Sequence, residues 1–356
     1  MKKLLNNYFS LVRNLFPEKK SHKPYLGLDI GTYSCKLIEI IPVKDSFEIL
    51  NWAVEPLMGK PPAEVMKALL NKLDIQSKNT TTGISGQGTL IRYIEMPKMS
   101  LADAKLSFTI EADKYFPFMK DQIFTDCCIL DTDRHDNKMF LVAAAAKREL
   151  VEQRISLLSG LGLDSDFIGM NAIAIANVFH VLGNGLTKSG QSSLPDAIAV
   201  LDIGQNVSSL ILLKNNIPFF TRDIFIGGAE LDRRIINVLG VSAQEAEKLK
   251  HYPAQRLSDI RAACDNILLN ISSELRLSFD YCATEYNIQI SKLFLTGGSS
   301  LLEGIDDIFT KNLDIPVERW NPFAGLKLLP GVSQEDINKN ATCLTVALGL
   351  ALYQND

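Results

Sequence analysis

The sequence predicts an α/β protein with two lobes, each built from the same unit, a β-meander followed by helices. The tetrapeptide Leu-Asp-Ile-Gly occurs at 28–31 and again at 201–204, and each copy ends an apolar run typical of a buried strand. After each copy come small or polar residues that favour a turn, and then two further apolar runs. A chain of 356 residues is long enough for two such lobes.

In the first half, the meander is expected as strands at 25–30, 35–41 and 47–54. Pro and Gly breaks between about 86 and 140 separate alternating strand and helix patterns, which indicates a small inserted α+β subdomain. The other elements expected in this half are a helix at 63–73, a strand beginning at 81, a helix at 147–162 and an almost wholly apolar, buried helix at 167–183.

The second half follows residues 186–196, a polar stretch rich in Gly and Ser that predicts a linker. The meander then restarts, and its strands are followed by helices over 228–288, a strand ending in a diglycine at 292–298 and a buried helix at 342–353. We therefore expect one lobe at 24–190 and a second at 191–335, with residues 336–356 returning to the first lobe.

Composition limits the class of protein. The net charge of −4 gives no reason to expect nucleic acid as a partner. The six cysteines show no paired or metal-ligand spacing, which favours reduced thiols packed in a cytosolic protein. No apolar run approaches the roughly 18 residues that span a bilayer.

Residues 1–23 differ from the rest of the chain. Their apolar residues recur with helical spacing, and lysines far outnumber the single acidic residue, Glu18. Since this stretch lacks the continuous apolar core of a secretory signal, two interpretations remain open. The helix either covers the protein's own surface, or it lies on an anionic membrane surface or docks on a partner there.

The two Leu-Asp-Ile-Gly turns have the chemistry of phosphate and metal sites. Glycine lets the backbone approach a ligand closely, and the N–H groups that follow it act as anion donors. Asp29 and Asp202, at the strand ends, can hold Mg²⁺ through water. Two such turns facing each other across a cleft between the lobes would bind a polyphosphate from both sides.

Two glycine pairs support this hypothesis. Gly297-Gly298 follows a strand and precedes a helix start, so its backbone can lie against a flat ring or a phosphate. Gly227-Gly228 opens a helix, and the segment after that helix carries Glu247 and Lys250.

The order of these pieces resembles the actin-like ATPase superfamily, over roughly residues 24–354. Within it the chain is similar to the PilM family of type IV pilus assembly proteins, on the stretches 25–40, 90–118, 141–163 and 294–305. The segment EADKYFPF at 111–118 is the most specific of them, because nucleotide binding does not require it. It lies in the subdomain whose position is shared with the cell-division protein FtsA.

The resemblance implies an actin-like ATPase fold that binds ATP with Mg²⁺ between its lobes. It places the first phosphate turn at Asp29, Gly31, Thr32, Tyr33 and Ser34, with Lys36 directed either at phosphate or outward. It places the second turn at Asp202, Gly204, Gln205 and Asn206. Adenosine would lie against Gly297, Gly298 and Ser299, with Glu247 and Lys250 reaching the ribose or base and Gly227 and Gly228 nearby.

The resemblance also implies a partner and a location. Such proteins hold the cytoplasmic N-terminal peptide of an inner-membrane PilN-like protein, so the expected location is cytoplasmic and peripheral to the inner membrane. Contacts with other pilus motor components and a homo-oligomer are further expectations. Tyr115, Phe116 and Phe118 form an aromatic cluster that is either a hot spot for the peptide or the subdomain's own core.

The second turn departs from the superfamily pattern. Relatives usually continue Asp-x-Gly-Gly-Gly-Thr, whereas this chain has Gln205, Asn206 and Val207 after Gly204. Near the start of the buried helix, only Asn171 is available to position an attacking water, and an amide cannot accept its proton. We therefore expect nucleotide binding with at most slow hydrolysis.

Two other classes remain as alternatives. One is a membrane-tethered, polymerising division protein like FtsA, but the chain's last residues, LALYQND, do not form the C-terminal membrane helix of that protein. The other is a small-molecule kinase of the same superfamily, which would need a catalytic aspartate and a substrate pocket that the sequence does not reveal.

Overall fold

The computed structural model describes residues 23–43, 46–77, 79–183, 197–324, 326–329 and 332–353. The predicted helix within 1–23, apart from Lys23, and the predicted linker at 186–196 lie outside these residues. The chain divides into two compact units. The first runs to Val178 and includes Gly325–Gln334 and Val346–Asp356, and the second comprises Phe179–Ala324 and Glu335–Thr345. The division therefore falls before the segment expected as the linker.

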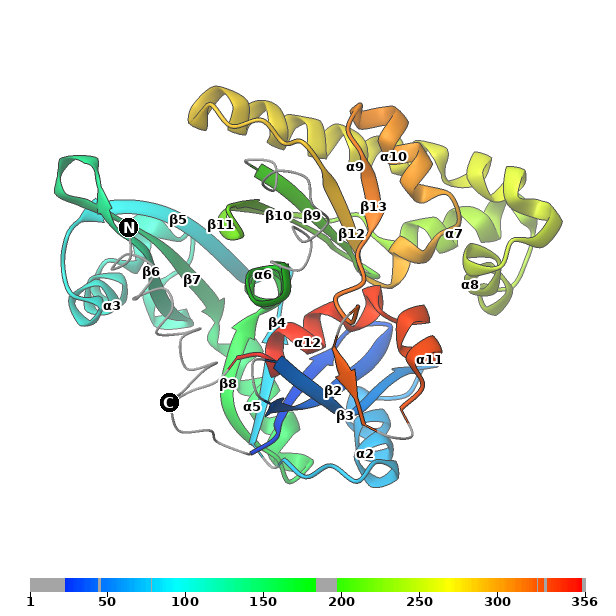
Figure 1. The fold of residues 1–356 in the computed structure, drawn as a ribbon, viewed down its shortest axis with the longest axis horizontal. Coiled ribbons are helices and arrows are strands. Elements are labelled where there is room, and N and C mark those ends of the chain that lie inside the picture. The colour runs from blue at the N-terminus through cyan, green and yellow to red at the C-terminus, as the bar shows by residue number, and fades with distance from the viewer. Residues whose placement is uncertain are drawn as a thin grey trace. The chain divides into compact units, whose positions relative to one another are not determined.

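The first unit contains a six-stranded sheet in the order β14-β3-β2-β1-β4-β8. Figure 1 labels its strands β2, β3, β4 and β8. Strands β1, β2 and β3 form the predicted antiparallel meander, while β4 and β8 are parallel to β1. The bounds are β1 (Tyr25–Ile30), β2 (Ser34–Val43), β3 (Ser46–Pro56), β4 (Asn79–Ile84), β8 (Asp164–Met170) and β14 (Lys327–Leu328).

The second unit contains a five-stranded sheet in the order β11-β10-β9-β12-β13. Strands β9, β10 and β11 again form an antiparallel meander, and β12 and β13 again run parallel to the first strand. The bounds are β9 (Ala197–Ile203), β10 (Ser208–Lys214), β11 (Ile217–Ile224), β12 (Leu293–Thr296) and β13 (Val317–Arg319). Strand for strand, this order matches β3-β2-β1-β4-β8, so the predicted duplication is confirmed by topology.

Helices pack against both sheets. In the first unit they are α2 (Pro62–Lys72), α5 (Arg148–Gly160), α6 (Asn171–Leu182), which continues into the second unit, and α12 (Thr345–Ala351). Gly27 and Gly349 mark two close approaches, because a Cβ on Gly27 would lie 2.1 Å from the Ala347 carbonyl and one on Gly349 2.0 Å from that of Ala174. The C-terminal helix thus needs glycine to reach this sheet and α6.

One predicted element is wrong. The helix expected at 167–183 begins only at Asn171, and the residues before it form β8. The run Phe167-Ile168-Gly169-Met170 is apolar and continues directly into the apolar helix, so periodicity does not mark the change. These residues form a strand because they pair in parallel with β4 along the whole length of β8.

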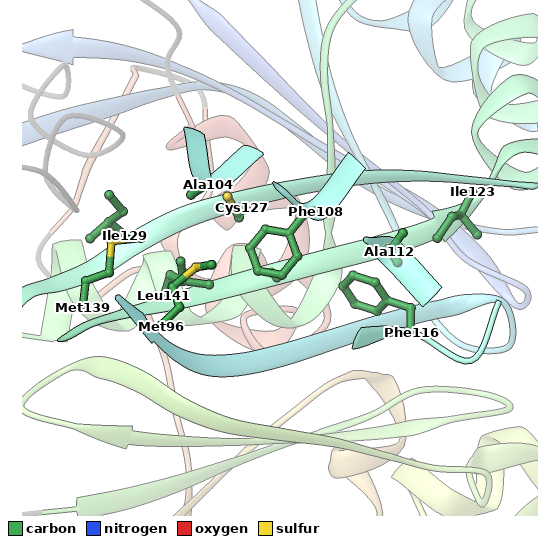
Figure 2. Close-up of a cluster of buried hydrophobic side chains, with 12 residues drawn as sticks. Met96, Ala104, Phe108, Ala112, Phe116, Ile123, Cys127, Ile129, Met139 and Leu141 are labelled. Atoms are coloured by element: carbon green, nitrogen blue, oxygen red, sulfur yellow. The ribbon is translucent and has the colours of Figure 1, made fainter. Parts of the chain in front are cut away.

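The inserted subdomain is a three-stranded sheet, β5-β7-β6, covered on one face by α3 and α4 (Figure 2). Its core packs Phe108 and Phe116 against β6 and β7. Ser100 caps α3 by accepting the amide hydrogen of Asp103. The bounds are β5 (Thr89–Pro97), α3 (Leu101–Ile110), α4 (Ala112–Tyr115), β6 (Ile123–Arg134) and β7 (Lys138–Lys147).

The second unit carries α7 (Gly228–Leu239), α8 (Ala243–His251), α9 (Leu257–Tyr286), α10 (Ile305–Leu313) and α11 (Gln334–Lys339). Short 3₁₀ turns lie at Gly298–Leu301 and Thr342–Leu344. Among the residues that the structure describes, no helix combines the length and apolar character needed to cross a membrane.

Candidate functional sites

The two Leu-Asp-Ile-Gly turns have the same geometry. In the first unit the Gly31 amide donates to the Ser34 carbonyl at 3.1 Å, and in the second unit the Gly204 amide donates to the Val207 carbonyl at 3.0 Å. Each turn therefore closes three residues after its glycine, at the end of the first strand of its sheet. The repeated sequence therefore folds into the same hydrogen-bonded turn in both units.

The first turn carries a buried ion pair. The Lys36 ammonium lies 3.0 Å from the Asp29 carboxylate, and both side chains are largely buried. The same ammonium would lie 3.2 Å from a Cβ on Gly31, so it lies beside the turn. Lys36 is therefore not directed outward, and its contact with a phosphate stays a prediction. Thr32, at the tip, is exposed, while the Tyr33 carbonyl accepts from the Leu57 amide and Ser34 is buried.

A second cation, Arg154, contacts the end of strand β1, next to this turn. From α5 its guanidinium donates to the Thr82 hydroxyl at 3.2 Å and to the Ile30 carbonyl at 3.4 Å. Burial lowers the pKa of Arg154, and the charge of Asp29 opposes that effect. Sequence reasoning missed Arg154, because a basic residue on an amphipathic helix looks like a solvated one.

Asn171 begins α6 and donates from its amide nitrogen to the Ser85 hydroxyl at 3.2 Å. Its side-chain oxygen is buried and, within the described part of the chain, accepts no hydrogen bond. That oxygen would lie 2.1 Å from a Cβ on Gly83, so Gly83 leaves the space that Asn171 occupies. Asn171 therefore keeps an unused acceptor, and its predicted role in positioning water stays a prediction.

In the second unit, the start of α7 is bonded to the second turn. The amides of Gly228 and Ala229 donate to the carbonyls of Gly204 and Gln205, at 2.9 and 2.8 Å. The Gly227 amide donates to the Glu230 carboxylate at 3.1 Å. These amides are already used within the protein, and a place for Gly227 and Gly228 beside a nucleotide stays a prediction. Glycine is needed here for close packing, since a Cβ on Gly227 would lie 2.6 Å from the Gly204 carbonyl.

A buried charge cluster joins α7 to α8. The Lys250 ammonium lies 2.6 Å from Asp232 and 2.5 Å from Glu247, and its side chain is only 2% exposed. Asp232 also accepts from the Gln205 amide nitrogen at 3.0 Å. Burial opposes ionisation of Glu247, but the hydrogen bond to His251 and the charge of Lys250 lower its pKa to about 2. The charges expected to reach the ribose or base are thus paired inside the protein.

The diglycine packs directly against β9. Gly297 has φ of +85°, and a Cβ there would lie 2.5 Å from the Ile203 carbonyl, so only glycine fits this position. The Ser299 hydroxyl donates to the Gly204 carbonyl at 3.3 Å, and Gly298 lies beside the thiol of Cys343. The structure therefore brings Gly297 and Ser299 to the second turn, and their predicted contact with adenosine stays a prediction.

Asp202 accepts from the Thr296 hydroxyl at 3.0 Å. Asn206, at the tip of the second turn, is exposed. Among the described residues, no cluster of three metal-ligating side chains is present. Since Mg²⁺ commonly needs only one or two carboxylates and several waters, the metal roles of Asp29 and Asp202 stay predictions.

The aromatic cluster at 115–118 belongs to the inserted subdomain's core. Phe116 is 2% exposed, and its ring lies 6.4 Å from that of Phe108. Tyr115 and Phe118 are partly buried and pack against the same core. Phe116 is thus a core residue and unavailable to a partner, which corrects the hot-spot interpretation for this residue.

A feature absent from the sequence analysis is an apolar pocket of about 470 Å³ in the first unit. Strand β7 contributes only alternate residues, Val142, Ala144 and Ala146, which is typical of a sheet face forming a floor. Strands β6 and β8 contribute consecutive residues, 124–128 and 167–170, so each presents its edge to the pocket.

The walls of the pocket have distinct chemistry. Lys105 of α3 pairs with Asp126 of β6 at 2.7 Å, and both residues line it. Phe167 stacks on Tyr353 with ring centroids 3.8 Å apart. Burial raises the pKa of Tyr353 above the ordinary tyrosine range. Six separate segments of the chain form this pocket, so no local sequence motif encodes it.

Comparison with known proteins shows where this fold belongs. A family model described as "Type IV pilus assembly protein PilM" matches residues 27–355. The chain belongs to the PilM family. A solved PilM–PilN type IV pilus biogenesis complex contains a similar chain, with a TM-score of 0.79, 25% identity, and coverage of 92% of this chain and 97% of that one.

A more distant structure shares the fold. The ethanolamine utilization protein EutJ from Carboxydothermus hydrogenoformans has a TM-score of 0.55 at 14% identity, covering 99% of this chain and 97% of that chain. This PilM-family chain thus has the predicted actin-like α/β fold.

Proposed function

We propose that this chain is a nucleotide-binding scaffold of type IV pilus assembly, acting at the cytoplasmic face of the inner membrane. In this proposal it binds the cytoplasmic N-terminal peptide of a PilN-like membrane protein. The observation that carries the partner part is the pocket walled by two strand edges. Support also comes from the family and from the similar PilM chain, whose solved complex contains PilN.

The proposed binding mode is addition of an extended peptide to a strand edge. Both β6 and β8 stand at the end of their sheet orders, so each has one side without a neighbouring described strand. Main-chain hydrogen bonds to such an edge supply affinity, while the apolar floor accepts alternate side chains. A volume of about 470 Å³ is within the range of ligand pockets.

The nucleotide part rests on the turns. At the first, the Lys36 ammonium beside Gly31 supplies a positive charge that fits a phosphate oxygen. At the second, Gly297 lets the diglycine backbone approach that of Ile203, next to Gly204. That both turns contact one ATP, with Mg²⁺ near Asp29 or Asp202, belongs to the proposal, and Mg²⁺ would supply charge neutralisation of the phosphates.

The partner part is tested by peptide binding. Fluorescence anisotropy would measure a labelled peptide from the cytoplasmic N-terminus of the organism's own PilN-like protein against the wild-type chain and Ala144→Trp. The indole would fill the pocket floor, so we expect loss of peptide binding with nucleotide affinity unchanged. Ala63→Trp, on exposed α2, is the matched control. Equal affinity of Ala144→Trp and wild type would contradict the proposed location.

A further inference from the structure

Gln205 stands at the second glycine of the superfamily pattern described above, and it is attached to α7 at two points. Its carbonyl accepts the Ala229 amide at 2.8 Å, and its side-chain nitrogen donates to Asp232 at 3.0 Å. Its side-chain oxygen would lie 2.8 Å from a Cβ on Gly228, so the carboxamide lies flat against the start of the helix. The side chain is therefore held against α7.

Asp232 is itself fixed in place. One of its oxygens faces Lys250 at 2.6 Å and the other accepts from Gln205. Lys250 is 2% exposed, and losing a carboxylate partner would leave its buried ammonium less well compensated. We therefore expect the contacts of Lys250 with Asp232 and Glu247 to persist. The Lys250 carbonyl also accepts the Glu303 amide at 3.1 Å, which ties α8 to the segment after the diglycine.

We infer that Asp232 and Lys250 are positioning residues for the second phosphate turn. They hold the Gln205 side chain against α7, so that a nucleoside triphosphate reaches the Gly204–Val207 backbone despite the bulk at position 205. A glycine at that position needs no such restraint. The inference rests on the proposed nucleotide binding and gives that site two residues that do not touch the ligand.

The charges of the cluster support this role over a ligand role. Two carboxylates face one buried ammonium, so Lys250 has no net positive charge to offer a phosphate. Asp232 would repel a phosphate directly but can hold an amide donor at no electrostatic cost. The cluster therefore acts on the nucleotide through Gln205.

The test is a double-mutant cycle in ATP affinity, measured by calorimetry with Mg²⁺ on the full chain. Asp232→Ala frees the Gln205 side chain, and we expect about tenfold weaker binding, the effect of losing a hydrogen bond to a charged group. Gln205→Gly alone gives the ATP affinity of a turn without the bulk at position 205. The variant with both substitutions should bind ATP as tightly as Gln205→Gly alone, because no bulk remains to be restrained. A purely structural role of Asp232 predicts no such rescue.

Two further variants keep the test decisive. Gln205→Leu retains the bulk, loses the hydrogen bond and leaves the Lys250 pairs intact, so it should weaken ATP binding even if Asp232→Ala fails to fold. Asp307→Ala, an exposed carboxylate of the same unit, is the matched control. Wild-type affinity in Asp232→Ala or Gln205→Leu would overturn the inference, as would a double variant that binds ATP about tenfold more weakly than Gln205→Gly alone. Absence of ATP binding by the wild type would overturn the inference and the nucleotide part of the proposed function together.

Discussion

The Lys36 ammonium lies 3.0 Å from the Asp29 carboxylate, and the two residues stand directly opposite each other across strands β1 and β2. At the matching position of the second unit, Asp202 stands opposite Ser209, whose hydroxyl donates to Asp223 at 2.7 Å. The duplicated turns thus share a backbone but differ in charge. Opposite its aspartate, the first turn has an ammonium and the second turn has a hydroxyl.

We expect Asp29→Ala to abolish measurable ATP binding. The substitution removes the carboxylate that holds Lys36 beside the turn, and it removes one expected position for Mg²⁺. Calorimetry with ATP or ADP and Mg²⁺ measures the effect. Glu64→Ala, in an exposed ion pair on α2, is the control and should bind like wild type. Tight binding by Asp29→Ala would show that the turn is only structural.

Two glycines with positive φ should differ sharply in their tolerance of alanine. At Gly240, with φ of +65°, the space for a Cβ is open, so Gly240→Ala should cost about 1 kcal/mol from the backbone alone. At Gly297, overlap with the Ile203 backbone adds to the same strain, and the loss should exceed about 3 kcal/mol. Urea unfolding of the two variants gives both values, and similar losses would contradict the packing described at the diglycine.

Glu247 should make stability depend on pH in the acid range. Its pKa is lowered from 4.5 to about 2 in the folded chain. The ionised carboxylate therefore stabilises the fold fully above pH 4.5, and this stabilisation is lost as the pH falls towards 2. The difference in unfolding free energy between wild type and Glu247→Gln should therefore shrink over that window. Urea unfolding at a series of pH values measures it, and Lys248→Met on the same helix serves as the control. A difference that is independent of pH would argue against the Lys250 and His251 contacts.

Cys343 should be the first of the described cysteines to react with an alkylating reagent. The other five are buried, and burial raises the pKa of Cys35 and Cys127 to about 11 and that of Cys264 to about 12. Since Cys343 lies beside Gly298, ATP bound at the diglycine should slow its modification. Mass spectrometry of iodoacetamide-treated protein gives the rates, with Cys282 as the internal reference. Equal rates with and without ATP would place the nucleotide elsewhere.

Much of the architecture could be predicted because it repeats. The two Leu-Asp-Ile-Gly copies led to the two meanders, and local backbone rules led to the turns at Gly31 and Gly204. The diglycine at Gly297 was predicted to lie against a ring or a phosphate, which stays a prediction, and its close approach to the Ile203 backbone was not foreseen. Periodicity failed at β8, where an apolar strand runs without a break into an apolar helix.

The rest of the site depends on contacts between residues distant in sequence. Nothing local distinguishes Asp232 or Arg154 from solvated charges on a helix, and only packing brings Asp232 to Gln205 and Arg154 to Ile30. Lys250 was noticed in the sequence, but its ion pair with Asp232 was not predicted, because that contact follows from how α8 packs on α7. The pocket was missed because it is formed by edges and faces of separate sheets.

The two strand edges that wall the pocket also have a consequence for how the protein exists in a cell. Among the described strands, β6 and β8 each end their sheet, and exposed strand edges favour pairing with another chain. We therefore expect a copy made in excess of the proposed partner to self-associate. Co-expression with that partner should then raise the yield of soluble protein.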